Sequence, residues 1–127
     1  MIGIVLVSHS AELAQGLVDL AGQVAGSEVI ITPAGGMADG GLGTSDALVR
    51  RAIQRANRGD GVVVLGDLGS AILTVRSVLE EVDDDTVRLV DAPLVEGAVA
   101  SAVVAAAGGS LEEVVRAAEG ARGARKL

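Results

Sequence analysis

After Met1 the chain continues with Ile2-Gly3-Ile4-Val5-Leu6-Val7, a nearly continuous apolar run that Ser8-His9-Ser10 follows directly. Such a run is typical of a β-strand buried on both faces, as in a parallel sheet covered by helices. From Ala11 to Ala25 the period changes, and an apolar helix face is formed by four residues at helical spacing: Leu13, Leu17, Leu20 and Val24. Gly26 is a suitable stop. The two segments predict the first strand and helix of an α/β domain.

The same alternation of short apolar runs and amphipathic stretches continues along the chain. We expect further strands at 28–32, where Pro33 closes the run, at 62–66 and at 87–90. We expect further helices from Thr44 or Ser45 to about Asn57, at 71–82, at 94–107 and after a cap at Ser110. The second and third helices carry these residues on their predicted inner faces: Leu48, Ala52, Ile53, Ile72, Val75, Val78 and Leu79.

The order of these elements predicts the sheet. A β-α-β-α-β-α-β-α-α order calls for an open, mainly parallel sheet with helices on both faces, and the common strand orders are 2-1-3-4 and 3-2-1-4. We adopt 2-1-3-4, in which ligand chemistry belongs beyond the carboxyl ends of strands one and three. The loops 8–10 and 67–70 should therefore face each other there. We assign 1–120 to one domain and 121–127 to a flexible tail.

The amino-acid composition excludes some classes of protein function. The 127 residues are 50% apolar, which suits one domain with a sizeable core and excludes a mainly disordered chain. Without Phe, Tyr or Trp the surface has no aromatic platform for single-stranded nucleic acid. Ten basic against seventeen acidic residues give a net charge of −7, which argues against nucleic-acid binding and suits a basic partner surface.

The sequence also argues against metal, thiol and membrane functions. There is no Cys, and a zinc site built around the single His would need an unusual set of carboxylates, so we expect no metal and no cofactor. The amino-terminal run lacks the basic residues and cleavage site of a secretory signal. The longest apolar run, 98–107, contains Ser101 and is too short to cross a bilayer. We expect a cytoplasmic protein that does not bind a membrane.

Several common catalytic motifs are absent. A P-loop needs a Gly-Lys pair, but the only Lys is Lys126. The dinucleotide fingerprint fails because Asp46 stands where its third Gly is required. No Ser lies on a Gly-x-Ser-x-Gly elbow, and a flavin site would lack aromatic cover. A response-regulator receiver domain would need an acidic pair after the first strand, which is missing.

His9 is the strongest candidate for a functional residue. It stands in the turn between the first strand and the first helix, where a rigid scaffold carries loop residues. Two interpretations stay open: an ordinary surface histidine at a strand end, or a phosphohistidine. In the second, the positive end of the following helix favours an uncharged ring, whose free nitrogen is a nucleophile. The free backbone N–H groups of that helix would stabilise an attached phosphoryl group.

The loop after the third strand offers partners for His9. Asp67 is either a turn residue or the acceptor of a hydrogen bond from the far ring nitrogen, which would fix the tautomer. Ser70 is expected to cap the next helix and, in the functional interpretation, to donate to phosphoryl oxygens. Gly69 would let the backbone approach closely. The remaining candidates for supporting contacts to phosphate are Ser10, Gly43 and Thr44, and simple helix capping is the alternative for Gly43-Thr44.

Four segments together resemble a known family. They are Ile4-Val5-Leu6-Val7-Ser8-His9-Ser10, Gly43-Thr44-Ser45-Asp46-Ala47, Gly66-Asp67-Leu68-Gly69-Ser70-Ala71 and Ala92-Pro93-Leu94-Val95-Glu96-Gly97-Ala98. In this order they resemble the phosphoryl-donor subunit of the phosphotransferase-dependent dihydroxyacetone kinase, over nearly the whole chain. More distantly, the chain is similar to the IIA domains of mannose-family sugar transporters. The resemblance implies a mannose-type IIA fold and a homodimer, and it places the family's supporting Asp and Ser at Asp67 and Ser70.

The resemblance also implies partners and a reaction. His9 takes a phosphoryl group from the histidine-carrier protein HPr and passes it to ADP held in the nucleotide-binding kinase subunit. The ATP so formed phosphorylates dihydroxyacetone bound by a third subunit. Some members carry carrier-protein and enzyme-I-like domains after this one, so a chain that ends here is expected to use separate carrier proteins. Two alternatives stay open: a sugar-transporter IIA domain that phosphorylates a IIB protein, and a non-catalytic dimeric regulatory module.

Overall fold

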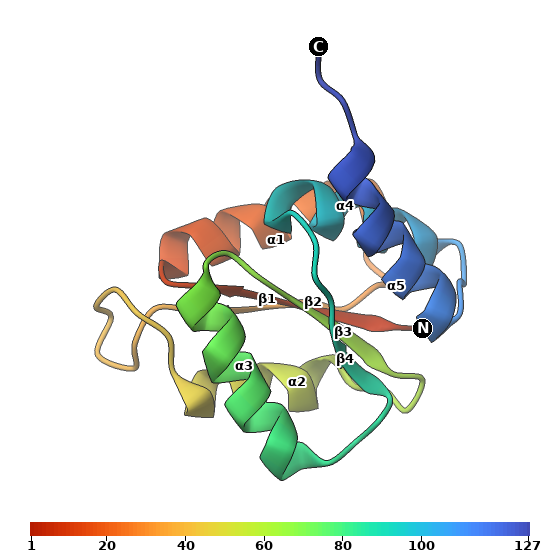
Figure 1. Cartoon of the computed structure of the whole chain (residues 1–127). Helices are drawn as coiled ribbons and strands as arrows, with labels where there is room; N and C mark the ends of the chain where they lie inside the picture. The colour runs from red at the N-terminus through yellow and green to blue at the C-terminus, as the bar shows by residue number, and fades with distance from the viewer.

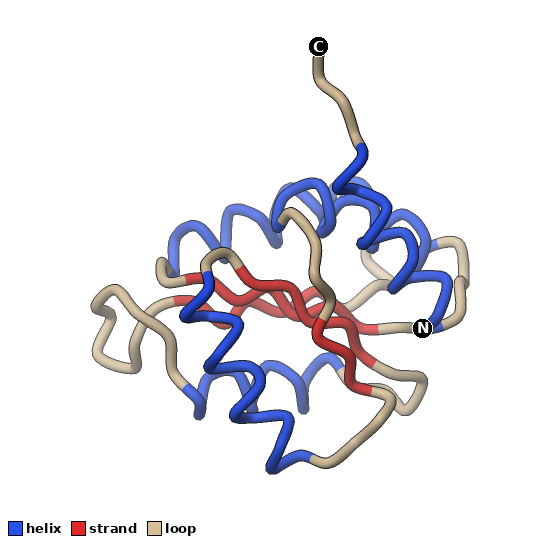
Figure 2. The backbone as a smooth tube through the Cα atoms, viewed as in Figure 1, coloured by secondary structure: helices blue, strands red, loops and turns tan.

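A computed structural model describes all 127 residues and has three layers, with a central sheet between two layers of helices (Figure 1). α1, α4 and α5 cover one face of the sheet, and α2 and α3 cover the other (Figure 2). The elements are β1 (Gly3–Ser8), α1 (Ala11–Ala25), β2 (Ile31–Gly35), α2 (Asp46–Ala56), β3 (Val62–Gly66), α3 (Gly69–Val82), β4 (Val87–Leu89), α4 (Leu94–Ala106), α5 (Leu111–Gly120) and a short 3₁₀ turn at Ala121–Gly123.

The sheet confirms the predicted fold class and strand order. Its four strands are all parallel and lie in the order β2-β1-β3-β4. β1 and β3 are central and pair over the whole length of β3, from Gly3 with Val62 to Val7 with Gly66. Every residue of both strands is buried, as the unbroken apolar runs predict for strands covered on two faces. The end of β1 therefore lies beside the end of β3.

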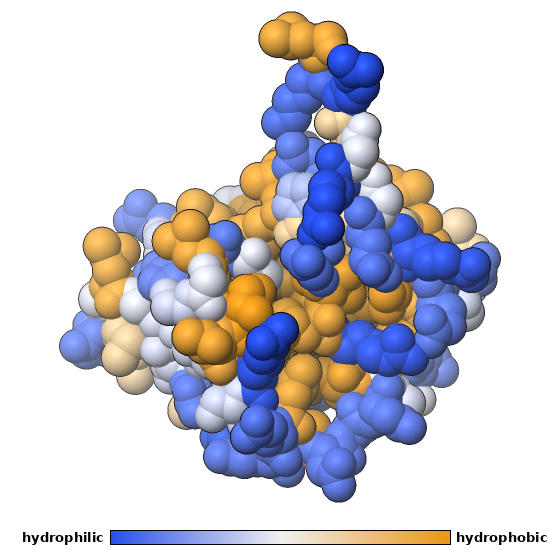
Figure 3. All heavy atoms as spheres, viewed as in Figure 1, coloured by the Kyte–Doolittle hydropathy of each residue, from blue (hydrophilic) through white to orange (hydrophobic).

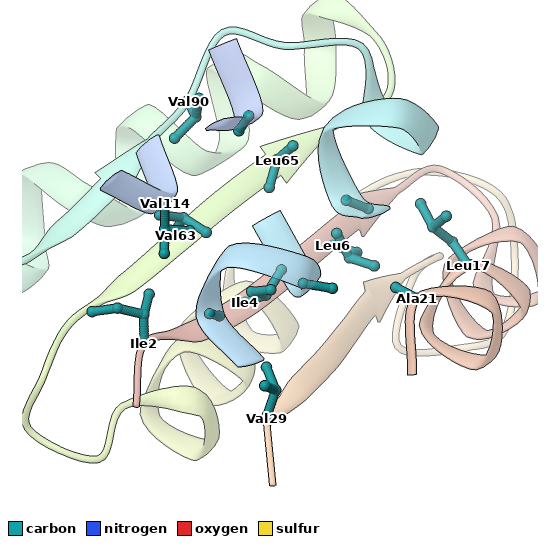
Figure 4. Close-up of a cluster of buried hydrophobic side chains, with 14 residues drawn as sticks. Ile2, Ile4, Leu6, Leu17, Ala21, Val29, Val63, Leu65, Val90 and Val114 are labelled. Carbon is teal, nitrogen blue, oxygen red and sulfur yellow. The ribbon is translucent and has the colours of Figure 1, made fainter. Parts of the chain in front are cut away.

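The core consists of two clusters, one on each face of the sheet. Side chains alternate along β1, so Ile4 and Leu6 enter the cluster under α1, α4 and α5, while Val5 and Val7 enter the cluster over α2 and α3. Figure 4 shows the first cluster, in which Leu65 of β3 also takes part. A core without aromatic residues is thus filled by branched aliphatic side chains, and it fixes β1 and the loop that follows.

The second strand differs from the prediction. β2 runs from Ile31 to Gly35 and contains Pro33, which was expected to close it. Pro33 is opposite Leu6 of β1. Proline is tolerated because β2 pairs only with β1 and leaves one side of its backbone unpaired, so the missing N–H interrupts no second ladder. The apolar residues before Ile31 led the prediction to place the strand too early.

The apolar stripe predicted on the first helix is only partly buried. Leu17 is 5% exposed, but Leu13, Leu20 and Val24 are 46%, 46% and 48% exposed. The side of α1 that meets the sheet is formed instead by Ala14, Leu17 and Ala21. Because residues advance about 100° each, the exposed stripe lies roughly 70° around the helix from that side. On the two helices of the opposite layer, Leu48, Ile72 and Leu79 are half-buried, whereas the other residues predicted to face inward are buried.

Candidate functional site

His9 and Asp67 meet at the carboxyl edge of the sheet. His9 follows the last residue of β1, and Asp67 follows the last residue of β3. The Asp67 N–H donates to the Val7 carbonyl at 3.1 Å, which extends the pairing of the two strands by one step. The parallel register therefore places both side chains on neighbouring loops, as the topology predicts.

Asp67 holds both the ring and the backbone of His9. Its Oδ1 lies 2.9 Å from His9 Nδ1, and its Oδ2 accepts a bond from the His9 N–H at 3.0 Å. Oδ2 also accepts from Ser8 Oγ at 2.9 Å, and Oδ1 accepts from the Leu68 N–H at 2.7 Å. The side chain of Asp67 is 15% exposed and that of His9 is 26% exposed. The carboxylate is fixed, while the ring remains open to solvent.

These contacts keep Asp67 ionised. Burial raises the pKa of its carboxyl, but the hydrogen bonds from the His9 backbone and ring, Ser8 and Leu68 lower it by more. The pKa of Asp67 is thus below its ordinary value of 3.8, because all four groups bind the charged form better than the neutral form. At neutral pH the carboxylate accepts, so Nδ1 of His9 carries the proton and donates it.

The second ring nitrogen faces Ser70. His9 Nε2 and Ser70 Oγ are 2.5 Å apart, and with the proton on Nδ1 the hydroxyl is the donor. The expected capping role of Ser70 is wrong, because α3 begins at Gly69 and its N-cap is Leu68, which has no side-chain hydroxyl. Asp67 instead accepts the Leu68 N–H at this helix start. The hydroxyl of Ser70 is consequently directed to the imidazole.

The glycine-rich loop between β2 and α2 is tied to the same site. The Gly43 N–H donates to the His9 carbonyl at 2.9 Å. Thr44 Oγ1 and Thr74 Oγ1 are 2.7 Å apart, and the Thr74 hydroxyl also bonds to the Ser70 carbonyl at 3.1 Å. Sequence analysis missed Thr74, although its position four residues after Ser70 on a helix was a usable signal.

The remaining predicted residues have other contacts. Ser10 is the N-cap of α1, where its hydroxyl accepts from the Leu13 N–H at 3.2 Å and its own N–H donates to Ser8 Oγ at 3.0 Å. Gly69 is exposed, and a Cβ built on it would meet no atom within 4 Å. Of the residues predicted to surround His9, the structure brings Asp67, Ser70 and Gly43 into direct contact with it.

Four exposed apolar side chains lie on the segments that contact His9. Leu42, Leu68 and Leu73 are 83%, 61% and 65% exposed, and Met37 is 42% exposed. We call these four residues the apolar rim. Leu42 is next to Gly43 in the sequence, and Leu68 and Leu73 are within three residues of Ser70; both Gly43 and Ser70 contact His9. Met37 lies beside Gly43, where its Sδ would meet a Cβ built on that glycine. Figure 3 shows apolar surface on the side of the molecule where this loop and the start of α3 lie, and hydrophilic surface along the lower edge.

The site is an exposed side chain and not a pocket. The cavities lie elsewhere, for instance one of about 400 Å³ between α2 and α3 that is lined by Arg50, Asn57 and Glu81. No group of three or more acidic, histidine or cysteine side chains is placed to hold a metal. None of the helices combines the length and the apolar character that crossing a membrane requires. An exposed imidazole outside any cavity, with exposed apolar residues on the neighbouring segments, suits a macromolecular partner better than an enclosed small substrate.

Comparison with known proteins gives a consistent result. The family model EIIA-man, described as the PTS system fructose IIA component, matches residues 3–115. A phosphoryl donor subunit DhaM of PEP-dependent dihydroxyacetone kinase 2 from Listeria innocua is 36% identical over 119 residues, covering 91% of this chain and 95% of the relative. DhaM of Providencia stuartii is 39% identical over 99% of this chain, which spans only 28% of that longer relative.

Solved structures agree with the fold described above. The crystal structure of a protein of unknown function, EF1359, has a TM-score of 0.84 and 33% identity, and the match covers 99% of this chain and 96% of the other. The phosphotransferase-system component EIIA from Streptococcus agalactiae has a TM-score of 0.71 at 19% identity over 97% and 93% of the two chains, which supports the fold alone. The chain therefore belongs to the EIIA-man family and, within it, to the group of DhaM phosphoryl donor subunits.

Proposed function

We propose that this chain is a phosphohistidine carrier in which His9 Nε2 receives a phosphoryl group from one protein and passes it to another. One observation supports the proposal above all: Asp67 Oδ1 lies 2.9 Å from His9 Nδ1 and accepts its proton, so the lone pair of the ring is on Nε2, in a side chain that is 26% exposed. A neutral imidazole with a fixed tautomer is a competent nucleophile at neutral pH.

The transfer itself follows from these contacts. The Nε2 lone pair attacks the phosphorus of the donor phosphohistidine in line, an Nε2–P bond forms, and the donor N–P bond breaks with its electron pair returning to the donor ring. The positive charge that develops on His9 is stabilised by Asp67 through Nδ1–H. The Ser70 hydroxyl, which now donates to Nε2, can donate to a phosphoryl oxygen once Nε2 is occupied. Passing the group on reverses these steps.

The expected partners come from the family. We propose HPr as the phosphoryl donor and ADP bound in a DhaL-type kinase subunit as the acceptor, with dihydroxyacetone bound by a DhaK-type subunit as the final substrate. The relatives that support this are named as phosphoryl donor subunits of dihydroxyacetone kinases. The apolar rim provides an uncharged surface around His9 on which both donor and acceptor proteins can dock in turn. Residues 1–120 would act as the carrier domain in the cytoplasm.

A labelling experiment tests the proposal. The purified chain is incubated with enzyme I, HPr and radiolabelled phosphoenolpyruvate, and a label that is acid-labile and base-stable is expected on His9. His9→Ala should not be labelled, and neither should His9→Gln, which keeps a polar side chain. A wild-type chain that gains no label, or a His9→Ala chain that still gains it, would overturn the proposal.

A second step identifies the acceptor. The labelled chain is mixed either with an ADP-loaded kinase subunit or with a IIB protein of a mannose-family transporter. Transfer to ADP, measured as labelled ATP, is the expected result. Transfer only to the IIB protein would assign the chain to sugar transport. Labelling without transfer to either protein would contradict both acceptors and leave the phosphohistidine chemistry standing alone.

A further inference from the structure

Ser8 is a polar residue buried at the end of an apolar strand. It is the last residue of β1, it is only 1% exposed, and the four residues before it, at 4–7, are all apolar and fully buried. A hydroxyl placed among apolar groups costs free energy unless its hydrogen bonds are satisfied. The presence of a serine at this buried position is therefore explained by the bonds that its hydroxyl makes and not by packing.

The two bonds of the Ser8 hydroxyl have a fixed direction. Oγ accepts from the Ser10 N–H at 3.0 Å and donates to Asp67 Oδ2 at 2.9 Å. An N–H group can only donate and an ionised carboxylate can only accept, so the single proton of the hydroxyl belongs to the bond with Asp67. The bond from the Ser10 N–H polarises the hydroxyl and strengthens its donation. Burial raises the pKa of Asp67, and the Ser8 hydroxyl acts with the bonds from His9 and Leu68 to lower it.

Ser8 differs from the other three donors to the Asp67 carboxylate. Two of them are the backbone N–H groups of His9 and Leu68, which the chain supplies whatever side chain stands at those positions. The third is the imidazole Nδ1–H, which belongs to the group that is being held. Apart from the histidine itself, Ser8 is thus the one side chain that binds the carboxylate.

The backbone around Ser8 is fixed on both sides. β1 lies between β2 and β3 in the sheet (Figure 2). The Ser8 carbonyl accepts from the Gly36 N–H at 3.1 Å, and the neighbouring Val7 carbonyl accepts from the Asp67 N–H at 3.1 Å. A side chain carried by such a strand is placed more precisely than one on a free loop. Because Oδ2 is bound to Ser8 and to the His9 N–H, the carboxylate cannot turn about its Cβ–Cγ bond without breaking these bonds, and Oδ1 stays directed at Nδ1.

We propose that Ser8 is a positioning residue for phosphoryl transfer. Its hydroxyl holds the Asp67 carboxylate in the orientation that keeps the ring proton of His9 on Nδ1 and leaves Nε2 free to receive the phosphoryl group. Ser8 touches neither ring nitrogen and acts only through Asp67. The role in transfer rests on the proposed function, whereas the effect on the tautomer of His9 does not.

The first test measures that tautomer. His9 is the only histidine, so the ring signals in a nitrogen NMR spectrum of the whole chain belong to it without ambiguity. In mildly alkaline buffer, where imidazole is uncharged, the wild-type ring is expected to be mainly the Nδ1–H tautomer. Ser8→Ala should show a larger share of the Nε2–H tautomer, because the carboxylate is less firmly directed at Nδ1. An unchanged share in the folded variant would overturn the proposal.

The second test measures the rate of labelling of His9 by enzyme I, HPr and radiolabelled phosphoenolpyruvate. We expect Ser8→Ala to be about 10-fold slower than wild type, as for other groups that orient a functional histidine. Ser101→Ala is the matched control, because Ser101 is also fully buried but its hydroxyl bonds to the Gly97 carbonyl within α4. The control should keep the wild-type rate and tautomer. Equal rates for the two variants would contradict a positioning role for Ser8.

A conservative variant separates positioning from a general loss of stability. Ser8→Thr keeps the hydroxyl and suits a strand, so it should restore the wild-type tautomer and rate; a folded Ser8→Thr chain that behaves like Ser8→Ala would overturn the proposal. Circular dichroism establishes folding, and if Ser8→Ala unfolds, Ser8→Cys replaces it with a weaker donor of similar shape. A wild-type chain that gains no label would refute the proposed carrier function, while the NMR comparison would still decide whether Ser8 holds Asp67.

Discussion

Asp67 binds His9 twice, through Oδ1 to the ring Nδ1 at 2.9 Å and through Oδ2 to the backbone N–H at 3.0 Å. The same carboxylate also accepts from Ser8 and Leu68. Every one of its four partners is a donor. One side chain therefore joins the ends of the two central strands and fixes the imidazole tautomer.

Asp67→Asn should impair both phosphoryl transfer and stability. An amide has one acceptor oxygen and an NH₂ group, so it cannot accept from four donors, and part of the network is left unpaired. We expect the rate of labelling to fall about 10- to 100-fold, as for loss of other groups that orient a histidine. The free energy of unfolding should fall by about 1–3 kcal/mol. Stopped-flow transfer from HPr and urea denaturation measure the two effects. An unchanged labelling rate in a folded variant would contradict the orienting role.

The pH dependence of stability should show the lowered pKa of Asp67. The folded pKa is below the ordinary value of 3.8, so the native state holds the proton less tightly than the unfolded state. The stabilisation is fully present above pH 3.8 and is lost as the pH falls through the lower, folded pKa. Asp84, Glu96 and Glu113 also have lowered pKa values and contribute in acid. The difference between wild type and Asp67→Asn isolates the part that comes from Asp67; urea midpoints that differ equally at pH 7 and in strong acid would contradict it.

Ser70→Ala should slow transfer without unfolding the protein. Its hydroxyl contacts His9 Nε2 and does not cap α3, so we expect a loss of about 10-fold or more in rate and little change in stability. Ser77→Ala is the control, because Ser77 is an exposed serine farther along the same helix. The two variants are compared by labelling rate and by thermal unfolding. Equal labelling rates would show that the Ser70 hydroxyl has no part in the transfer.

Gly43→Ala should disturb the site more than Gly40→Ala. Both glycines have positive φ, 134° and 89°, so both variants carry backbone strain. A Cβ at Gly43 would lie 2.8 Å from Met37 Sδ, whereas one at Gly40 meets nothing within 4 Å. Gly43 also donates to the His9 carbonyl. We expect a several-fold slower labelling for Gly43→Ala beyond the effect of Gly40→Ala, which serves as the measure of strain alone. Identical rates would mean that the loop does not position His9.

The topology could be predicted because it depends on strongly patterned segments. The unbroken apolar runs of β1 and β3 and the alternation with helices predict a parallel sheet, and the strand order 2-1-3-4, adopted from two common orders, then places His9 beside Asp67. The predictions that were wrong concern details that depend on tertiary context. Whether Pro33 can lie within a strand depends on that strand being at an edge, which no local pattern reveals.

The spacing of apolar residues along a helix also does not predict which side of the helix packs against the sheet. The spacing of apolar residues on α1 identified a real stripe, but small residues, Ala14 and Ala21, meet the sheet and turn Leu13 and Leu20 outward. Ser70 was assigned to a cap because serine is common there, whereas α3 already begins at Gly69 and has Leu68 as its N-cap. The pair of hydroxyls from Thr44 and Thr74 joins segments 30 residues apart and required the structure.

The open position of His9 has a consequence for how long a carried group can persist. No cavity encloses the His9 ring, so the phosphoryl group that we propose on Nε2 would stay in contact with bulk water and would be open to hydrolysis. Such a molecule is suited to passing a phosphoryl group on quickly and poorly suited to holding it for long. The fraction of molecules that carry a phosphoryl group would then depend on the rate of transfer from the donor relative to the rate of transfer to the acceptor.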